Sequence, residues 1–350
     1  MKITFLAVMI ALPCLGQTER WYKGNTHAHT TLCGHADSPP SVVAQWYHDH
    51  GYNFAILSEH NKFIDPKTVK LKGEIREDFL LLPGEEVTGR KTVHSTAMNV
   101  NRLVPWHFDH EHRSKIIQKH VDETIKAGGA TILNHPNFGW AVQAKDMLPV
   151  KKLHLFELYN GHPKVHNFGD SRHPSTEQLW DDLLTQGMTI YGVGSDDAHH
   201  FADWKPNKSN PGRGWVMVRT KELTSDAITD AMTGGDFYAS SGIMLKTVVR
   251  GSKRIEVEVD EKATVEELAS PILIGRKVKE GKPGYMIEFI GPEGKVVATS
   301  DKTKASCPVN LPYLRCKVTK RVKKDNGDLL EYYAWVQPVF TDDREKAAKE

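Results

Sequence analysis

Short apolar runs alternate with amphipathic stretches from residue 21 to about residue 245. The apolar runs end in polar side chains, which is typical of buried strands. The amphipathic stretches begin with serine and end in glycine, which indicates N-capped helices with a glycine stop. This alternation predicts an α/β barrel or a doubly wound sheet. The predicted strands cover residues 53–60, 79–86, 131–136, 153–160 and 188–200, and the predicted helices cover residues 38–51, 114–129 and 175–187.

The pattern changes after residue 245. Runs with strand-like alternation, such as "RIEVEVD", "GYMIEFIG" and "YYAWVQPVF", are now separated by Gly-Pro and Asn-Gly turns. We therefore expect a large domain over residues 17–245, a small β-sandwich-like domain over residues 246–345 and a solvated tail over residues 346–350.

The first residues, "MKITFLAVMIALPCLG", combine an early lysine, a short apolar run and a small residue at a plausible cleavage point. This pattern predicts a signal peptide over residues 1–16 and export to the periplasm or the medium. A membrane anchor is disfavoured because the apolar run is too short. A lipid on Cys14 is disfavoured because Pro13 precedes it. No later segment is apolar and long enough to span a bilayer, so the mature chain is expected to have no membrane span.

The remaining cysteines leave alternatives open. Cys307 and Cys316 could form a disulfide in an oxidising compartment, or they could be two separate thiols. Cys33 lies among the first histidines, where we interpret it as a small loop residue rather than as a ligand.

Composition and charge exclude few classes of protein. The 350 residues are 39% hydrophobic and 26% charged, which is ordinary for a globular chain. The net charge of +2 comes from scattered charges without a long basic stripe, so no stable binding of duplex nucleic acid is expected.

Histidines and acids gather where the predicted strands end. His27 and His29 are two residues apart on an extended segment, so their side chains point the same way and can hold one ion. The carboxyl ends of parallel strands meet on one face of a barrel, which brings distant residues into one site. The residues in these positions are His27, His29, His35, Glu59, His60, Asn61, Glu85, Glu86, His94, Asn134, His135, Glu157, Asp197 and His199.

Any one of these histidines alone would be better explained as a hydrogen-bonded or exposed side chain than as a ligand. Together with buried carboxylates at successive strand ends they favour metal binding, because uncompensated buried charge is costly. Imidazoles with carboxylates suit Zn²⁺, Mn²⁺ or Fe²⁺ better than Ca²⁺ or Mg²⁺. We interpret six others as solvated, structural or turned away, namely His48, His50, His107, His110, His112 and His200.

The ordered motifs "THAHT", "LSEHN", "PGEEVT", "VHS", "NHPN" and "GSDDAH" resemble the PHP (polymerase and histidinol phosphatase) superfamily. They cover residues 25–199 in that family's order. The resemblance implies a distorted, TIM-like (β/α)7 barrel with two or three clustered divalent ions of Zn, Mn or Fe. It also indicates an exported member that carries an extra C-terminal β domain.

The resemblance implies a role for each matching residue. One ion is held by His27, His29, Glu86 and Asp197, a second by Glu86, His94 and His135, and a third by His35, His60 and His199. The family patterns select Glu86 over Glu85 and Asp197 over Asp196. The catalytic residues are expected to be Glu86, Asp197 and His199, and the supporting residues Glu59, Asn61, Asn134 and Glu157. This chain departs from the family where it has Glu59, because the acid at that position is usually aspartate.

The implied activity is hydrolysis of a phosphomonoester or phosphodiester by metal-activated water, with a nucleotide, an oligonucleotide end or a sugar phosphate as substrate. Basic residues near the ligands are candidates for phosphate binding, namely Arg213, Lys208 and Arg90. Two alternatives remain. One is an amidohydrolase-like metallohydrolase acting on a C–N or ester bond, and the other is an exported protein that binds metal or glycan without catalysis.

Overall fold

The computed structural model describes residues 18–341. The predicted signal peptide, Cys14 and the predicted tail at 346–350 lie outside these residues. None of the helices in the described part has the length and apolar character needed to cross a membrane.

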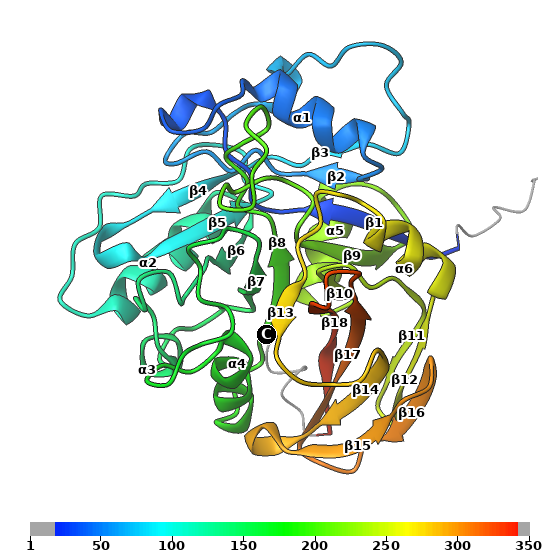
Figure 1. The fold of residues 1–350 in the computed structure, drawn as a ribbon. Coiled ribbons are helices and arrows are strands. Elements are labelled where there is room, and N and C mark those ends of the chain that lie inside the picture. Colours follow the sequence, from blue (N-terminus) through cyan, green and yellow to red (C-terminus); the bar gives the residue numbers. More distant parts are fainter. Residues whose placement is uncertain (1–17, 342–350) are drawn as a thin grey trace, which may run out of the picture.

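Residues 18–341 form three sheets (Figure 1). The largest sheet contains β1 (Arg20–Asn25), β2 (Phe54–Ala55), β3 (Leu80–Leu81), β9 (Trp215–Thr220), β10 (Phe237–Ser240), β13 (Arg276–Val278), β14 (Gly284–Ile290), β15 (Val296–Ser300), β17 (Tyr313–Lys323) and β18 (Leu329–Phe340). Its strand order is β15-β14-β17-β18-β10-β9-β1-β2-β3, and β13 pairs with β18. The second contains β4 (Gly84–Thr88), β5 (His94–Met98), β6 (Ala130–Leu133), β7 (Leu155–Asn160) and β8 (Tyr191–Ser195). The third contains β11 (Leu245–Gly251), β12 (Arg254–Val259) and β16 (Lys304–Pro308).

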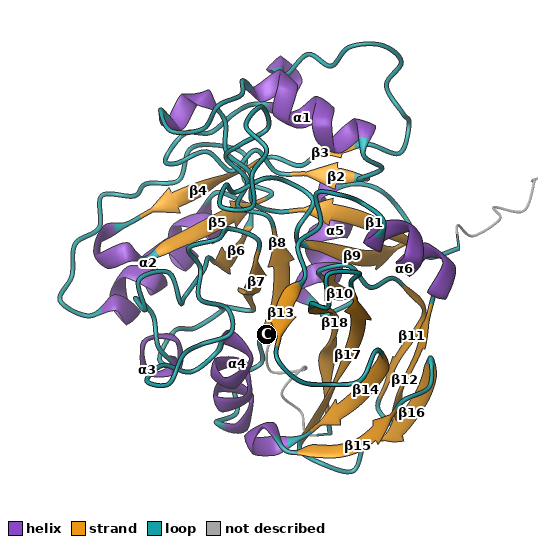
Figure 2. Ribbon diagram, viewed as in Figure 1, coloured by secondary structure: helices purple, strands orange, loops and turns teal. Residues whose placement is uncertain are grey.

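The helices lie outside the strands (Figure 2). Helix α1 contacts β2, α2 contacts β5 and β6, α4 contacts β7, and α5 contacts β9. The α-helices are α1 (Pro40–Asp49), α2 (Arg113–Lys126), α3 (Ala144–Met147), α4 (Thr176–Thr185), α5 (Ser225–Thr233) and α6 (Glu261–Leu268), and the 3-10 turns are η1 (Thr31–Cys33), η2 (Pro66–Thr68), η3 (Arg90–Thr92) and η4 (Pro292–Gly294).

The fold is mixed α/β, as predicted, but a closed barrel is not shown. Within residues 18–341, regular strand pairing leaves β1 to β3 and β4 to β8 in separate sheets. Two single parallel bridges join these sheets, Ala28 to Ala198 and His60 to Glu86. Both bridges involve the histidine-rich segments, so the two sheets meet where the candidate ligands lie.

The predicted helices are present, but serine caps only one of them. Ser175 caps α4 by accepting from the backbone N–H of Gln178, whose side chain in turn accepts from the Ser175 N–H. Helix α1 instead begins after Pro39 without a side-chain cap, and α2 begins after His112 in the same way. Gly51, Gly128 and Gly187 follow the three helices with positive φ, so the glycine stops are confirmed.

The C-terminal strands continue the sheet of the first strand, because β18 pairs with β10 and β10 pairs with β9. The predicted boundary at residue 245 therefore falls within a connected set of strands, and the division into two domains stays a prediction. Cys307 on β16 and Cys316 on β17 are both buried free thiols in this structure.

A buried ion pair joins the C-terminal strands to the helical layer. Arg315 on β17 donates from Nε and Nη2 to the two carboxylate oxygens of Asp181 on α4, both at 2.7 Å. Glu177 Oε2 lies 3.6 Å from Arg315 Nη1. Burial would lower the pKa of Arg315, but the charge and hydrogen bonds of Asp181 and the charge of Glu177 together outweigh burial and raise it. Arg315 therefore keeps its charge at every physiological pH.

We expect Asp181→Ala to lower the free energy of unfolding by about 3 kcal/mol, because it leaves the Arg315 charge buried with only Glu177 nearby. Urea denaturation at pH 7 measures the change. The matched control is Asp182→Ala at the exposed neighbour, for which the change should stay within about 0.5 kcal/mol. Equal effects of the two substitutions would contradict the assigned role.

Candidate metal centre

Seven of the nine candidate ligands line a cavity of about 360 Å³ at the strand ends, and the fully buried His27 and His29 contact two of them, Glu86 and Asp197. His27 and His29 follow β1, His60 follows β2, His135 follows β6, and Asp197 and His199 follow β8. Glu86 and His94 instead lie on β4 and β5 themselves. The cavity is lined by His35, His60, Glu86, His94, His135, Phe138, His162, Lys164, Asp197, His199 and His200.

The backbone is strained at several of these positions. Asn61, His135 and Asp197 adopt positive φ values of 51°, 25° and 50°, a region that side chains other than glycine rarely occupy. Such conformations cost about 1–3 kcal/mol each and collect at functional sites. At His135 and Asp197 the positive φ means that the backbone does not continue as a regular strand.

The first group of ligand atoms surrounds His27. Its Nε2 lies 3.0 Å from His29 Nε2 and 3.4 Å from both Asp197 Oδ1 and Glu86 Oε1. His29 Nε2 lies 3.4 Å from Asp197 Oδ1 and 3.7 Å from Glu86 Oε2. Ligands about 2.0–2.1 Å from a tetrahedral ion are separated by about 3.3 Å. His27, His29 and Asp197 therefore have the spacing of ligands of one ion, and Glu86 has a carboxylate oxygen close to each of the two histidines.

The protons on these imidazoles support the same interpretation. His27 Nδ1 lies 2.7 Å from Glu157 Oε1, and His29 Nδ1 faces Glu59 Oε1 at 3.5 Å. An Nδ1 proton directed at a carboxylate leaves the lone pair on Nε2. The Nε2 atoms of His27 and His29 face each other at 3.0 Å, a separation that suits either a shared proton or a cation between them.

The pKa shifts also indicate that this group of residues favours a bound positive charge. Burial would lower the pKa of His27, but Asp197, Glu157 and Glu86 outweigh burial and raise it well above its usual range. Burial would likewise raise the pKa of Glu86, but the neighbouring imidazoles hold it well below its usual range. Protons on the histidines or a divalent ion can supply this charge.

Glu86 also belongs to a second group of ligand atoms. Its Oε1 lies 3.4 Å from His94 Nδ1 and 3.3 Å from His135 Nε2, and it accepts from Asn134 Nδ2 at 2.9 Å. Its buried Oε2 has no well-aligned hydrogen-bond donor among the described residues, although His60 Nδ1 lies 2.6 Å away. Glu86 therefore lies between the two groups, with Oε1 facing His27 as well as His94 and His135, and this donor set fits a dinuclear centre.

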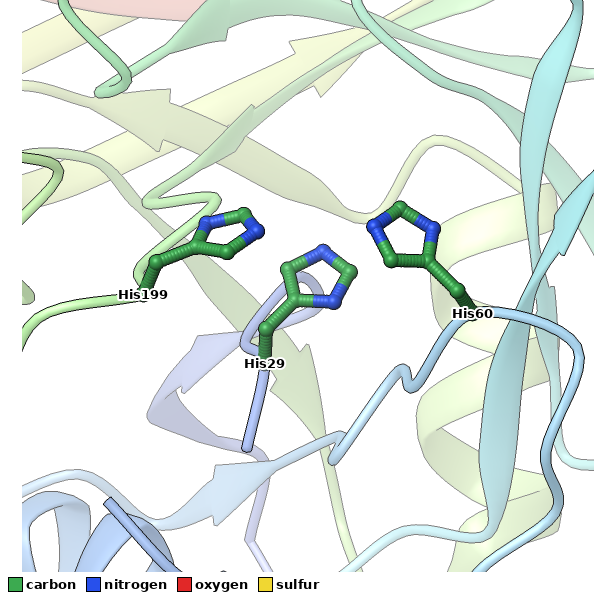
Figure 3. A group of neighbouring side chains, drawn as sticks. All are labelled: His29, His60 and His199. Atoms are coloured by element: carbon green, nitrogen blue, oxygen red, sulfur yellow. The ribbon is translucent and has the colours of Figure 1, made fainter. Parts of the chain in front are cut away.

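A third group lies beside His29. Figure 3 shows His29 between His199 and His60, and its ring centroid lies 4.1 Å from that of His199 and 4.3 Å from that of His60. His35 Nε2 lies 3.0 Å from His199 Nε2, whereas the His35 and His60 ring centroids are 5.2 Å apart. The structure thus brings the three predicted ligands of the third ion together, with His35 and His199 closest.

The predicted supporting residues hold the ligands. Glu59 accepts from the Thr30 N–H and hydroxyl, Asn61 pairs with the backbone of Thr88, and Asn134 binds Glu86. Glu157 contacts His27 and accepts from the His135 N–H at 2.7 Å and the Ser195 hydroxyl at 2.5 Å.

Asn160 supports the site but was not predicted. Its Nδ2 donates to Glu157 Oε2 at 2.8 Å and to Asp197 Oδ2 at 3.2 Å. The signal was available in the sequence, because Asn160 ends the same predicted strand as Glu157.

The neighbouring acids have different roles. Glu85 accepts from the Val104 N–H at 2.5 Å, outside the ligand group. Asp196 accepts from the backbone N–H groups of Gly212, Arg213 and Gly214. The structure therefore places Glu86 and Asp197, the residues selected from the sequence, in the cluster.

The three predicted phosphate contacts do not line the cavity. Arg213 is buried and donates to Asn210 Oδ1 and to the carbonyl oxygens of Lys205 and Lys208, so it fastens its own loop. Lys208 Nζ lies 3.3 Å from Asp203, and the exposed Arg90 faces Asp109 at 3.7 Å.

Other polar side chains line the cavity instead of these three cations. Lys164 and His162 line the cavity, and neither was predicted from the sequence. His200, which we expected to face away, also lines it.

Comparisons with known proteins add little. No protein family model and no curated protein matches this chain. A solved structure of a two-domain protein from Bacteroides vulgatus, containing a predicted PHP-like metal-dependent phosphoesterase, is similar over 95% of this chain and 99% of its own. The identity is 14% and the TM-score 0.44, so this likeness carries no argument here.

We expect Glu86→Gln to weaken metal binding by more than about 100-fold, because loss of a ligand should exceed the 10–100-fold typical for loss of a supporting residue. Calorimetric titration of metal-free protein with Zn²⁺ or Mn²⁺ measures the affinity. Glu85→Gln, at the adjacent buried acid, should bind as the wild type does. If both variants bind normally, Glu86 is not a ligand.

Glu85 also predicts a pH dependence of stability. Burial raises its pKa from 4.5 to about 7, against the smaller effect of the Val104 N–H. Between these values the folded protein binds more protons than the unfolded chain, so its stability falls as the pH rises, by up to about 3 kcal/mol.

Glu85→Gln removes this titration. The stability of the variant relative to the wild type should therefore rise between pH 5 and pH 8, as measured by denaturant unfolding at both values. An equal difference at the two pH values would refute the shifted pKa.

Proposed function

We propose that this chain is a metal-dependent phosphoesterase of the PHP type. The observation that carries the proposal is the set of Nε2 and carboxylate atoms around His27, spaced about 3.0–3.7 Å apart as ligands of one ion are. These residues stand in the order of the PHP motifs. Export of the chain and a phosphorylated substrate, such as a nucleotide or a sugar phosphate, are parts of the same proposal.

The residues that would hold the ions form three sets, two of which share Glu86. His27, His29, Asp197 and Glu86 would hold one ion, Glu86 with His94 and His135 a second, and His35, His60 and His199 a third. Bound divalent ions would supply Lewis acidity toward water and toward phosphate oxygens.

Side chains of this protein would orient the ligands and contact the substrate. Glu157 and Asn160 orient His27 and Asp197 by hydrogen bonds, so the ligand geometry is set before substrate arrives. His162 Nδ1 accepts from the Lys164 N–H at 3.1 Å, which leaves its proton on Nε2 as a donor at the cavity wall. Lys164 supplies a cation at the same wall, where a substrate phosphate would need one.

A substrate panel tests this proposal against the alternatives. Metal-loaded protein is assayed on phosphomonoesters, phosphodiesters, amides and lactones under identical conditions. We expect turnover of at least one phosphoester class and its loss on treatment with a chelator. Hydrolysis confined to amides or lactones would favour the amidohydrolase alternative. Glycan or metal binding without any hydrolysis would favour the non-catalytic one.

Lys164→Met tests the phosphate contact. We expect kcat/KM for the best phosphoester to fall about tenfold or more, mainly through KM, because a charge-assisted hydrogen bond contributes about 1.5–3 kcal/mol. The control is Lys151→Met, at an exposed lysine that does not line the cavity, which should leave kcat/KM unchanged. Equal kinetics for the two variants would remove Lys164 from the site.

A further inference from the structure

Cys33 completes a ligand group that the three proposed sets do not include. Its Sγ lies within 4.8 Å of a ring nitrogen of His35 and of a ring nitrogen of His199, and those two nitrogens also lie within 4.8 Å of each other. Around a tetrahedral zinc ion with ligand distances of about 2.3 Å to sulfur and 2.0–2.1 Å to nitrogen, the S to N separation is about 3.6 Å. The observed group lies within reach of this geometry.

The loop that carries Cys33 is fastened to the segment that carries His199. The Asp37 N–H donates to the His199 carbonyl at 3.0 Å, and the Asp37 carboxylate accepts from the Phe201 N–H at 2.8 Å. Thr30 caps the η1 turn that ends at Cys33, and Gly34 follows it with a φ of 83°. Cys33 is therefore held beside His35 and His199 by the backbone.

The tautomers of the two histidines favour a cation between them. His35 Nδ1 lies 3.3 Å from the Cys33 carbonyl and His199 Nδ1 lies 3.0 Å from the Asp197 carbonyl, so both Nδ1 atoms carry protons. Their Nε2 lone pairs then face each other at 3.0 Å. This repeats the arrangement of His27 and His29, with a thiol in place of the carboxylates.

The remaining histidine of the predicted third set has one ring nitrogen directed at other groups. His60 Nδ1 lies 2.6 Å from both Thr88 Oγ1 and Glu86 Oε2, so His60 is anchored toward Glu86. His60 groups with His29 and His199 rather than with His35. A third ion at His35 and His199 therefore needs another ligand, and among the described residues Cys33 forms a group with both of these histidines.

We propose that Cys33, as a thiolate, is a ligand of the third ion together with His35 and His199. Binding exchanges the thiol proton for the cation, and the proton leaves to solvent. A soft sulfur ligand favours Zn²⁺, Fe²⁺ or Co²⁺ over Mn²⁺, so this position differs in metal preference from the carboxylate-rich sites around Glu86. The inference deepens the proposed function but concerns metal binding alone.

Cobalt substitution tests the proposal without any activity assay. Metal-free full-length protein is titrated with Co²⁺, bound cobalt is measured by elemental analysis, and the near-ultraviolet absorption from sulfur-to-cobalt charge transfer is recorded. We expect this absorption in the wild type and in Cys307→Ser, a variant of a buried thiol outside the cluster. We expect its loss in Cys33→Ser, with one cobalt ion bound about tenfold or more weakly.

A second measurement uses the unaltered chain, in case a variant does not fold. Alkylation of Cys33 by iodoacetamide, mapped by mass spectrometry, should slow at least tenfold when Co²⁺ is added. Bound cobalt without charge-transfer absorption, or with the absorption retained in Cys33→Ser, would overturn the proposal but leave the other ions in place. Absorption without phosphoesterase activity would support Cys33 as a ligand and count against the proposed function alone.

Discussion

Buried negative charge at one end of the strands is the constraint on which the site depends. Glu86, Asp197 and Glu157 are each less than a tenth exposed and lie within a few ångströms of one another's partners. Carboxylates so far from water are stable only when positive charge and hydrogen-bond donors surround them. Imidazoles and amide groups supply the donors here. Their directions then leave the Nε2 lone pairs of His27 and His29 facing inward, and this fixes where a cation can bind.

The backbone is shaped to satisfy that constraint. Single bridges at Ala28 and at His60 bring the two sheets together at the site itself, rather than along the whole length of the strands. Left-handed backbone at His135 and Asp197 turns their side chains into the cluster. The free energy stored in these conformations must be offset by the interactions that they permit. In this part of the fold, the candidate ligands lie where regular strand pairing is interrupted.

The sequence indicated which candidate ligands lie together better than it indicated the loops or the closure of the sheets. Strand periodicity and motif order are local properties, so residues such as His29 and Glu86 could be placed from neighbours in the chain. Arg213 could not, because its contacts with Asn210 and the carbonyl of Lys205 depend on how one loop folds back on itself. Lys164 was missed for the same reason. The extent of strand pairing between β1 and β8 depends on twist and packing, which no short motif records.

The C-terminal strands contribute to the metal centre through β8. Gln337 on β18 accepts from the Gly192 N–H and donates to the Gly192 carbonyl, both at 2.8 Å, so a side chain takes the place of a neighbouring strand. Ser195 at the end of the same strand donates to Glu157, and Asp197 follows two residues later. The position of β8 thus links the C-terminal strands to the orientation of His27. The segment that sequence patterning assigns to a separate β domain therefore contacts, through Gln337, the strand that positions the candidate ligands.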